Sequence, residues 1–345
     1  MSRYIYKSGL ELAGMIRNGQ ASSVDITKAH LDQIKEHNDA LNAVIIHTGE
    51  EALKTAEECD REAKKGDFRG PLHGVPMTIK EQFWLKGQKS TINFNRYKDF
   101  VAPEDALVVD RLKKAGAIIM GKTNVPKKLL DYQVWGDIYP EGKNPYDLAY
   151  SPGGSSGGSA AALVAGMTPL ELGGDFGGSI RIPSYYCGLF GLKPTEYTIP
   201  NHGILPRLES EKWHVFEMAV SGPLARTVGD MELVWKIIRG PHHSDRISPR
   251  IDWHDASGKK LDEYKIAWVD EWPDYEPSDE IKTVIRDFVE VLKNQGCKTE
   301  NAVSGNDLHT RSLSLWMRLS GIVLSQGCSL VCKAIDEVGY ETNRI

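Results

Sequence analysis

Tyr150 to Pro194 read YSPGGSSGGSAAALVAGMTPLELGGDFGGSIRIPSYYCGLFGLKP and contain two dense glycine runs, Gly153 to Gly158 and Gly173 to Gly178. Serine lies in or beside both runs. Glycine costs conformational entropy on folding, and it is kept where the backbone takes positive φ or approaches a partner closely. The two runs therefore indicate two places where main chain lies against something small.

Serine beside consecutive glycines suits acyl transfer. A hydroxyl can attack a carbonyl while unshielded backbone N–H groups hold the developing oxyanion. The residues from Phe176 to Ser179 could supply such donors. A Gly/Ser linker is the alternative, but the first run leads directly into the apolar, helix-forming residues 160–165. Because a linker would not usually join a buried helix in this way, the pattern favours a site.

The amino-acid composition limits the classes of protein to which the chain can belong. The 345 residues are 41% hydrophobic and 26% charged, which is typical of a soluble globular chain with a large core. A net charge of −5, with acidic and basic residues interspersed, argues against nucleic-acid binding. No segment approaches about 18 consecutive apolar residues, and residues 1–20 lack the apolar core of a signal peptide. We expect a cytoplasmic protein without a membrane partner.

The cysteines form an odd, scattered set without CxxC spacing. They are Cys59, Cys187, Cys297, Cys328 and Cys332. Cys328 and Cys332 are one helical turn apart, but two ligands do not make a zinc site. We expect small buried hydrophobic residues, with neither disulfides nor a metal.

The periodicity of apolar residues predicts alternating helices and strands. Strand 75–80, helix 104–116 and strand 117–120 follow one another, which indicates a parallel βαβ unit. Helices are expected to begin with the capping box at Ser8 and with the cap at Thr227. The other expected elements are a helix through 24–34, strand 43–46, helix 50–65, strand 264–269, helix 278–294, a weak strand 299–303 and a largely helical segment 308–331.

Lys80 stands at the end of the predicted strand 75–80. A lysine at a strand end is usually solvated, but this one follows a tight entry at residues 73–76 and is flanked by Ile79 and Phe83. A desolvated lysine loses its proton more easily and can act as a base. Because neither glycine run contains histidine, lysine is the natural base for a serine nucleophile.

Other chemistries fit less well. Gly153-x-Ser155-x-Gly157 has the spacing of a nucleophile elbow, but residues 144–152 read as turns rather than the strand that an elbow requires. Neither glycine run carries a phosphate-binding pattern. Ser257 to Lys260 matches S-x-x-K inside a charged linker, which we interpret as chance.

The chain resembles the amidase signature family over residues 8–240. The segments that carry the resemblance are HGVPMTIKEQF (73–83), EDALVVDRLKKAGAIIMGKTNVP (104–126), NPYDLAYSPGGSSGGSAAA (144–162), LELGGDFGGSIRIPSYYCGLFGLKPT (170–195) and SGPLARTVGDM (221–231). The resemblance implies an α/β fold, in which α-helices cover a mixed, twisted β-sheet. It also implies a covalent acyl-enzyme that water releases, without a metal or an organic cofactor.

The resemblance assigns roles to individual residues. Ser179 corresponds to the nucleophile, Ser155 to a bridging serine that follows a cis peptide bond, and Lys80 to the base. The remaining correspondences are an oxyanion hole from the amides of Phe176, Gly177, Gly178 and Ser179, supporting roles for Ser156, Asp175 and Arg181, and a place near the substrate carbonyl for Leu129.

Two departures from the family's pattern lead to expectations. Gly174 stands before Asp175, where a threonine is usual, and we expect it to loosen the loop that holds Ser179. Family members also continue with a Gly/Pro-rich segment, so we expect an open sheet edge at the C-terminal end. We predict a single domain over 1–345, with a catalytic core at 1–240, a linker at 241–260 and an incomplete α/β continuation at 261–345.

We predict a hydrolase that cleaves linear, non-peptide amides, acting on small aliphatic or aryl carboxylic amides. Homodimer formation stays open. One alternative is the glutaminase-type subunit of a tRNA-dependent amidotransferase, although residues 203–220 look more like the general amidases. The other alternative is an inactive, truncated remnant.

Overall fold

The computed structural model describes residues 2–205, 218–242, 249, 251, 253, 258–271, 276–302 and 308–325. These residues form two compact units, and the boundary between the units along the chain lies after Ile251. The boundary falls within the segment 241–260, for which the sequence predicts a linker. Among the described helices, none combines the length and the hydropathy that crossing a membrane requires.

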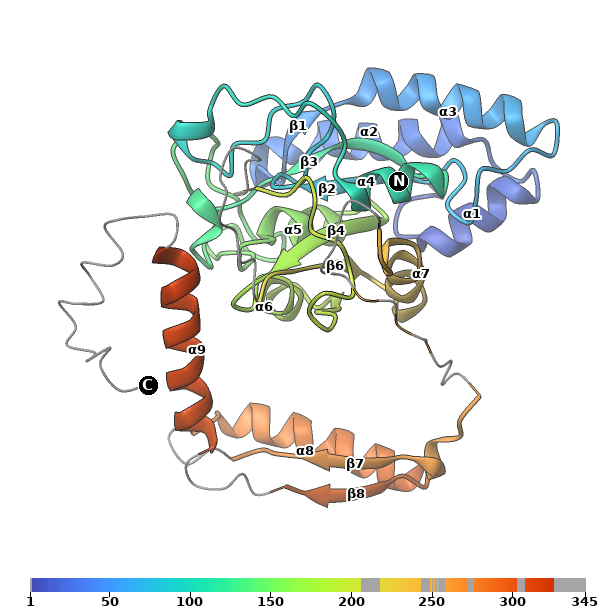
Figure 1. The fold of residues 1–345 in the computed structure, drawn as a ribbon. Coiled ribbons are helices and arrows are strands. Elements are labelled where there is room, and N and C mark those ends of the chain that lie inside the picture. Colours follow the sequence, from blue (N-terminus) through green and yellow to red (C-terminus); the bar gives the residue numbers. More distant parts are fainter. Residues whose placement is uncertain are drawn as a thin grey trace. The chain divides into compact units, whose positions relative to one another are not determined.

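The first unit is built on a six-stranded mixed sheet (Figure 1). Its strands are β1 (Val44–His47), β2 (Pro76–Lys80), β3 (Ile118–Thr123), β4 (Leu170–Asp175), β5 (Phe190–Gly191) and β6 (Val220–Ala225). Their order across the sheet is β1-β3-β2-β4-β6-β5. Strand β2 is parallel to both β3 and β4, whereas β1, β5 and β6 pair antiparallel with their neighbours. The predicted mixed α/β sheet is therefore confirmed.

The predicted βαβ unit is also confirmed, since α4 (Leu107–Lys114) connects the parallel strands β2 and β3. Strands β4 and β6 are not among the elements that the sequence predicts. Every residue of both strands is buried, so neither shows the alternation of a half-exposed strand. Glycines in β4 and the Gly222-Pro223 pair in β6 also read as turn signals.

Helices cover both faces of the sheet (Figure 1). They are α1 (Gly9–Arg17), α2 (Ser23–Leu41), α3 (Gly49–Ala63), α4, α5 (Gly157–Val164), α6 (Arg181–Tyr186) and α7 (Val228–Ile238), with short 3-10 turns at Asn95–Tyr97 and Lys127–Leu129. The capping box at Ser8 and the cap at Thr227 are present as predicted. Helix α5 is almost fully buried because its residues are small, and this lets it lie close to the sheet.

Alternation along β2 separates an apolar face from a polar one. Met77 and Ile79 belong to the largest hydrophobic cluster, which they share with residues of α1, α4 and α7. Successive side chains of a strand point to opposite faces, so Thr78 and Lys80 belong to the other face. Helix α5 packs against both β2 and β4. This arrangement buries a lysine at a strand end.

The second unit contains the parallel pair β7 (Lys265–Trp268) and β8 (Lys298–Asn301), connected by α8 (Asp279–Asn294). A 3-10 turn at Leu261–Glu263 precedes β7, and α9 (Leu308–Ser325) follows β8. The strand, helix and strand predicted here are confirmed. Residues 326–331 of the predicted last helix, and the C-terminal end for which an open edge is expected, lie outside the described residues.

Three of the cysteines, Cys59, Cys187 and Cys297, are buried free thiols, as the sequence predicts. Cys328 and Cys332 lie outside the described residues.

Candidate functional site

Lys80 ends β2 with 1% of its surface exposed. Its Nζ lies 2.7 Å from Ser155 Oγ and donates to the Gly174 carbonyl at 3.1 Å. Burial removes water from the ammonium group and lowers the pKa of Lys80 to about 7, although the negative charges of Asp175 and Glu171 oppose this effect. Near neutral pH, a large fraction of the protein molecules therefore carry Lys80 as an uncharged amine.

The first glycine run forms a tight turn before α5. The peptide bond between Gly154 and Ser155 is cis. A Cβ on Gly154 would lie 2.5 Å from the Asp131 carbonyl oxygen, so only glycine fits there. The Ser156 amide donates to the Ser179 carbonyl at 3.1 Å, and Ser156 Oγ donates to the Gly174 carbonyl at 3.3 Å. The two glycine runs, far apart in sequence, thus meet through Ser156.

The second run folds around the carboxylate of Asp175, which ends β4. Asp175 accepts hydrogen bonds from the amides of Gly178 and Ile180, at 2.9 and 3.0 Å. The Arg181 guanidinium donates two more to it, at 3.1 and 2.9 Å. Burial raises the pKa of Asp175, but the hydrogen bonds from Arg181, Ile180 and Gly178 outweigh burial and hold the pKa below its ordinary value. These bonds fix the turn that presents Ser179, which is 6% exposed.

Residues 176–178 form the turn between Asp175 and Ser179. Gly178 takes φ of 114°, which disfavours any residue with a side chain. The Gly177 carbonyl accepts a hydrogen bond from the Tyr132 hydroxyl at 2.7 Å. Since Ser151 Oγ also donates to the Tyr132 carbonyl at 3.0 Å, Tyr132 links the second glycine run to the residue two positions before the first run.

Gly174 lies inside β4, paired with Ser221, rather than in a loop. That Gly174 loosens the following loop, which holds Ser179, stays a prediction. Its carbonyl accepts from both Lys80 and Ser156, and a Cβ at this position would lie 2.6 Å from Gln82 Nε2. The Gln82 side chain thus occupies the space beside Gly174.

Within the described part of the chain, hydrogen bonds and the turn from Asp175 to Ser179 bring most of the expected site residues into one cluster. Its members are Lys80, Ser155, Ser156, Asp175, Gly178, Ser179 and Arg181, with Phe176 and Gly177 in the same turn. Leu129 stands apart from this network: it takes φ of 64°, its amide donates to the Pro126 carbonyl, and it packs against the main hydrophobic cluster.

Sequence reasoning missed two polar groups beside this cluster, Tyr132 and Glu171. Tyr132 lies in an aromatic, turn-rich segment where nothing distinguishes it from its neighbours. Glu171 carries a signal, because an acid between Leu170 and Leu172 in an apolar segment is unusual for a buried strand.

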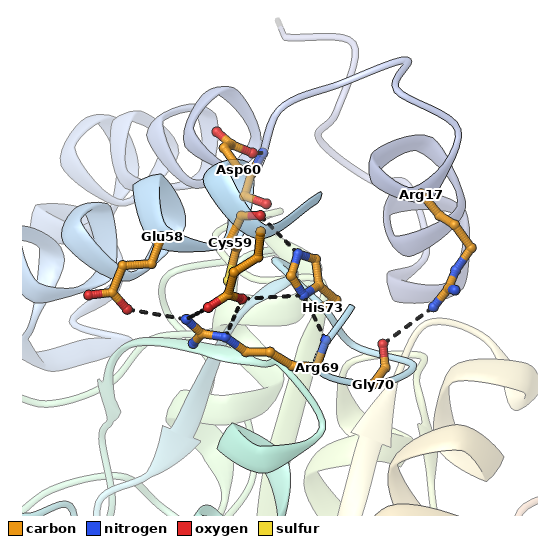
Figure 2. Close-up of polar contacts among 9 residues, drawn as sticks. Arg17, Glu58, Cys59, Asp60, Arg69, Gly70 and His73 are labelled. Atoms are coloured by element: carbon orange, nitrogen blue, oxygen red, sulfur yellow. Dashed lines mark hydrogen bonds and ion pairs between the residues drawn. The ribbon is translucent and has the colours of Figure 1, made fainter. Parts of the chain in front are cut away.

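A second polar cluster lies between α3 and the segment before β2 (Figure 2). Cys59, Glu62 and His73 place three potential metal-ligand atoms within 4.8 Å of one another. His73 Nδ1, however, accepts from the Arg69 amide at 3.1 Å, so Nε2 donates to the Cys59 carbonyl at 3.0 Å. Glu62 binds the Arg69 guanidinium at 2.6 and 2.7 Å, and burial raises the pKa of the Cys59 thiol to about 11. These contacts describe a structural hydrogen-bond network, because the imidazole has no lone pair left for a cation.

The chain is similar to several known proteins. The family model Amidase matches residues 25–319. A glutamyl-tRNA(Gln) amidotransferase subunit from Carboxydothermus hydrogenoformans is 34% identical over 306 residues, covering 86% of this chain and 60% of the relative. An acylamidase from Rhodococcus erythropolis is 34% identical over 264 residues, covering 76% of this chain and 54% of the relative.

A solved structure of fatty acid amide hydrolase superposes with a TM-score of 0.80 at 29% identity, covering 93% of this chain and 57% of that one. The chain thus spans at most about 60% of the length of these relatives.

Proposed function

The chain belongs to the amidase signature family, and we propose that it hydrolyses small aliphatic or aryl carboxylic amides to an acid and ammonia or an amine. The observation that carries this proposal is the 2.7 Å contact between the buried Lys80 Nζ and Ser155 Oγ, beside the turn that presents Ser179. A neutral amine in contact with a hydroxyl is the arrangement that general-base activation of a serine requires.

In the proposed acylation step, Ser179 Oγ attacks the amide carbonyl while Ser155 takes the Ser179 proton and passes its own proton to Lys80. The protonated Lys80 then returns this proton through Ser155 to the leaving nitrogen, and the carbon–nitrogen bond breaks. Water attacks the resulting ester by the same route and releases the acid. The chain itself supplies base, relay and nucleophile, so the proposal includes no metal or organic cofactor.

The oxyanion is proposed to bind backbone amides of the turn after β4. Of the four amides that the family resemblance suggests, the Gly178 N–H donates to Asp175. The N–H groups of Phe176, Gly177 and Ser179 remain as donors for the oxyanion. Asp175 and Arg181 are proposed to hold this turn rather than to contact substrate.

A panel of amides with released ammonia or amine as the readout tests the proposed function. We expect turnover of small aliphatic or aryl amides by the chain in its present length, with no turnover by a Ser179→Ala control purified in parallel. Absence of turnover across the panel, from protein that melts cooperatively, would contradict the proposal.

A second candidate function is supported by the similarity to the amidotransferase subunit over 86% of this chain. In that case the amide would be glutamine, and the chain would work with partner subunits. Glutamine hydrolysis that exceeds the hydrolysis of every other amide, together with copurifying subunits, would favour this candidate.

Replacing Asp175 with asparagine should lower kcat/KM by about 10²-fold, because misplacement of the reacting groups by about 1 Å has that effect. The variant loses the charge that binds Arg181 and an acceptor for the amides of the turn. The Tm should also fall. Since the pKa of Asp175 lies below its ordinary value, the wild type should lose this stabilisation as the pH falls through the folded-state pKa, whereas the variant should not.

Asp270→Asn is a matched control, because Asp270 pairs with Arg286 in the second unit. It should lower Tm and leave kcat/KM unchanged. Equal loss of kcat/KM in both variants would contradict a local role for Asp175.

A further inference from the structure

A buried acid lies in the same layer as Lys80, and the proposed reaction does not use it. Glu171 is in β4 and has no exposed surface. Its Oε1 accepts a short hydrogen bond from Thr78 Oγ1, on the strand that ends with Lys80. Its Oε2 is buried without a hydrogen-bond partner among the described residues.

Strand register places Glu171 and Lys80 on one face of the sheet. Thr78 pairs with Glu171, and Lys80 lies two residues beyond Thr78 along β2, which is about 7 Å along the strand and on the same face. Gly173, which follows Glu171 on that face of β4, contributes no side chain. The carboxyl group and the amine therefore share a buried layer.

The neighbouring elements add few charges to this layer. Thr123 of β3 and Ser159 of α5, whose hydroxyls are 2.8 Å apart, are neutral, and so is Leu224 of β6, which pairs with Glu171. Asp175 of β4 is neutralised by Arg181. At the ends of β2 and β3, the buried groups Glu81 and Lys122 compensate each other's charge.

An ionised Glu171 would carry a fully buried charge, which is costly even though neutral hydroxyls and a backbone amide lie close to the carboxylate. Burial accordingly raises the pKa of Glu171 to about 8, although the nearby Thr78 and Ser159 hydroxyls, the Leu172 amide and the Thr123 hydroxyl oppose this rise. Lys80, with a pKa of about 7, titrates in almost the same range. The negative charge of Glu171 raises the pKa of Lys80, so the protonation of the two groups is linked.

We propose that Glu171 is a positioning residue of the amidase site that shares a proton with Lys80 and thereby controls how much of the lysine is an uncharged base. This inference rests on the proposed function. When the fully protonated pair loses one proton, that proton leaves either the ammonium or the carboxylic acid. Only loss from the ammonium produces the base, and an ionised Glu171 favours the charged, inactive lysine.

Glu171→Gln tests this proposal because glutamine keeps the size and the acceptor for Thr78 but cannot ionise. We expect the acid limb of kcat/KM to move to lower pH by about half a unit or more and to fit one proton, since a nearby negative charge no longer holds the lysine proton. The plateau of kcat should stay within about 3-fold of wild type, because the proposed role of Glu171 is to set the protonation of Lys80 and not to bind substrate.

Thr78→Val provides a second variant of similar volume. It removes the hydroxyl that stabilises the carboxylate, so Glu171 should remain protonated to higher pH and the acid limb should again move down. Asp230→Asn is the control: Asp230 is a buried acid on α7 that binds the amides of Gly9 and Leu10, and its loss should not move the limb. An acid limb that stays in place or moves up in both test variants would overturn the proposal.

Thermal melting gives a readout that needs no turnover. Because the folded-state pKa of Glu171 is raised from 4.5 to about 8, the wild type should lose stability between these pH values as the unfolded chain, but not the folded one, releases the proton. The Tm of Glu171→Gln relative to wild type should therefore rise from pH 5 to pH 8. A Tm difference between variant and wild type that does not change with pH would overturn the assignment of Glu171. A Tm difference that rises with pH, in protein without amidase activity, would support the assignment of Glu171 and contradict the proposed function.

Discussion

Ser179→Ala is expected to abolish covalent labelling by a fluorophosphonate and to lower kcat for amide hydrolysis by ~10⁴-fold or more. The proposed nucleophile is the Ser179 hydroxyl, and without it no acyl-enzyme can form. The fold should tolerate the change. The contacts that hold the turn come from the Ser179 carbonyl and from the carboxylate of Asp175, and the substitution removes neither.

Ser184→Ala is the matched control for this experiment. Ser184 lies five residues further on, in α6, and its buried hydroxyl has no hydrogen-bond partner among the described residues. The variant should label and turn over like wild type. Labelling of Ser179→Ala at another serine, Ser155 included, would reject the assignment of the nucleophile.

The relation between the two glycine runs explains how much of the site could be predicted. Serine and glycine in Gly153 to Ser159 and in Gly173 to Ser179 indicate close backbone approach from local sequence alone. Lys80 could be expected to be buried because its neighbours along the chain are apolar. These are local signals, and the structure brings their residues together.

What could not be predicted depends on contacts between distant segments. Tyr132 contacts Gly177 across 45 residues, and no local pattern in the aromatic segment around Tyr132 indicates this bond. Strand β4 escapes prediction because a central strand buried on both faces loses its alternation and because glycine is unusual in strands. Gly174 belongs to this strand, and its carbonyl accepts hydrogen bonds from Lys80 and Ser156.

Substrate choice depends on side chains beyond the reacting groups. An acylamidase and an amidotransferase subunit both resemble this chain at 34% identity. The residues discussed above contact the reacting carbonyl and its proton relay in the proposed reaction, so they do not discriminate between acyl groups. Side chains farther from the carbonyl must do so, and the half-exposed Tyr132, whose hydroxyl contacts the Gly177 carbonyl, is one candidate.

Lys80→Met is expected to lower kcat/KM by ~10³-fold or more, because general-base catalysis typically contributes 10²–10⁴-fold and a serine relay without its base loses most of that contribution. The acid limb of the wild-type profile, expected near the lysine pKa of about 7, should disappear in the variant. Lys80→Arg should be equally inactive, because a guanidinium does not release its proton at neutral pH. Activity above a tenth of wild type in either variant would contradict the role of Lys80.

Lys80→Met should raise the stability of the protein although it lowers the activity. Burial lowers the folded-state pKa of Lys80 from 10.5 to about 7, so between these values the unfolded chain binds a proton that the folded chain does not. Wild-type stability therefore rises with pH through this window. Lys80→Met has no such slope. Below pH 7 the unfolding free energy of the variant should exceed that of wild type by on the order of a few kcal/mol. This difference should shrink towards pH 10.5.

Lys122→Met separates this effect from the removal of any buried lysine. Lys122 is the neighbouring buried lysine on β3, and burial lowers its pKa to about 8, but its Nζ binds Ser90 and faces the carboxylate of Glu81. Losing it leaves Glu81 without its positive partner, so this variant should be destabilised, while the acid limb of kcat/KM stays near pH 7. A gain in stability from Lys80→Met together with a loss from Lys122→Met would show that one buried amine is kept for its reactivity and the other for its charge.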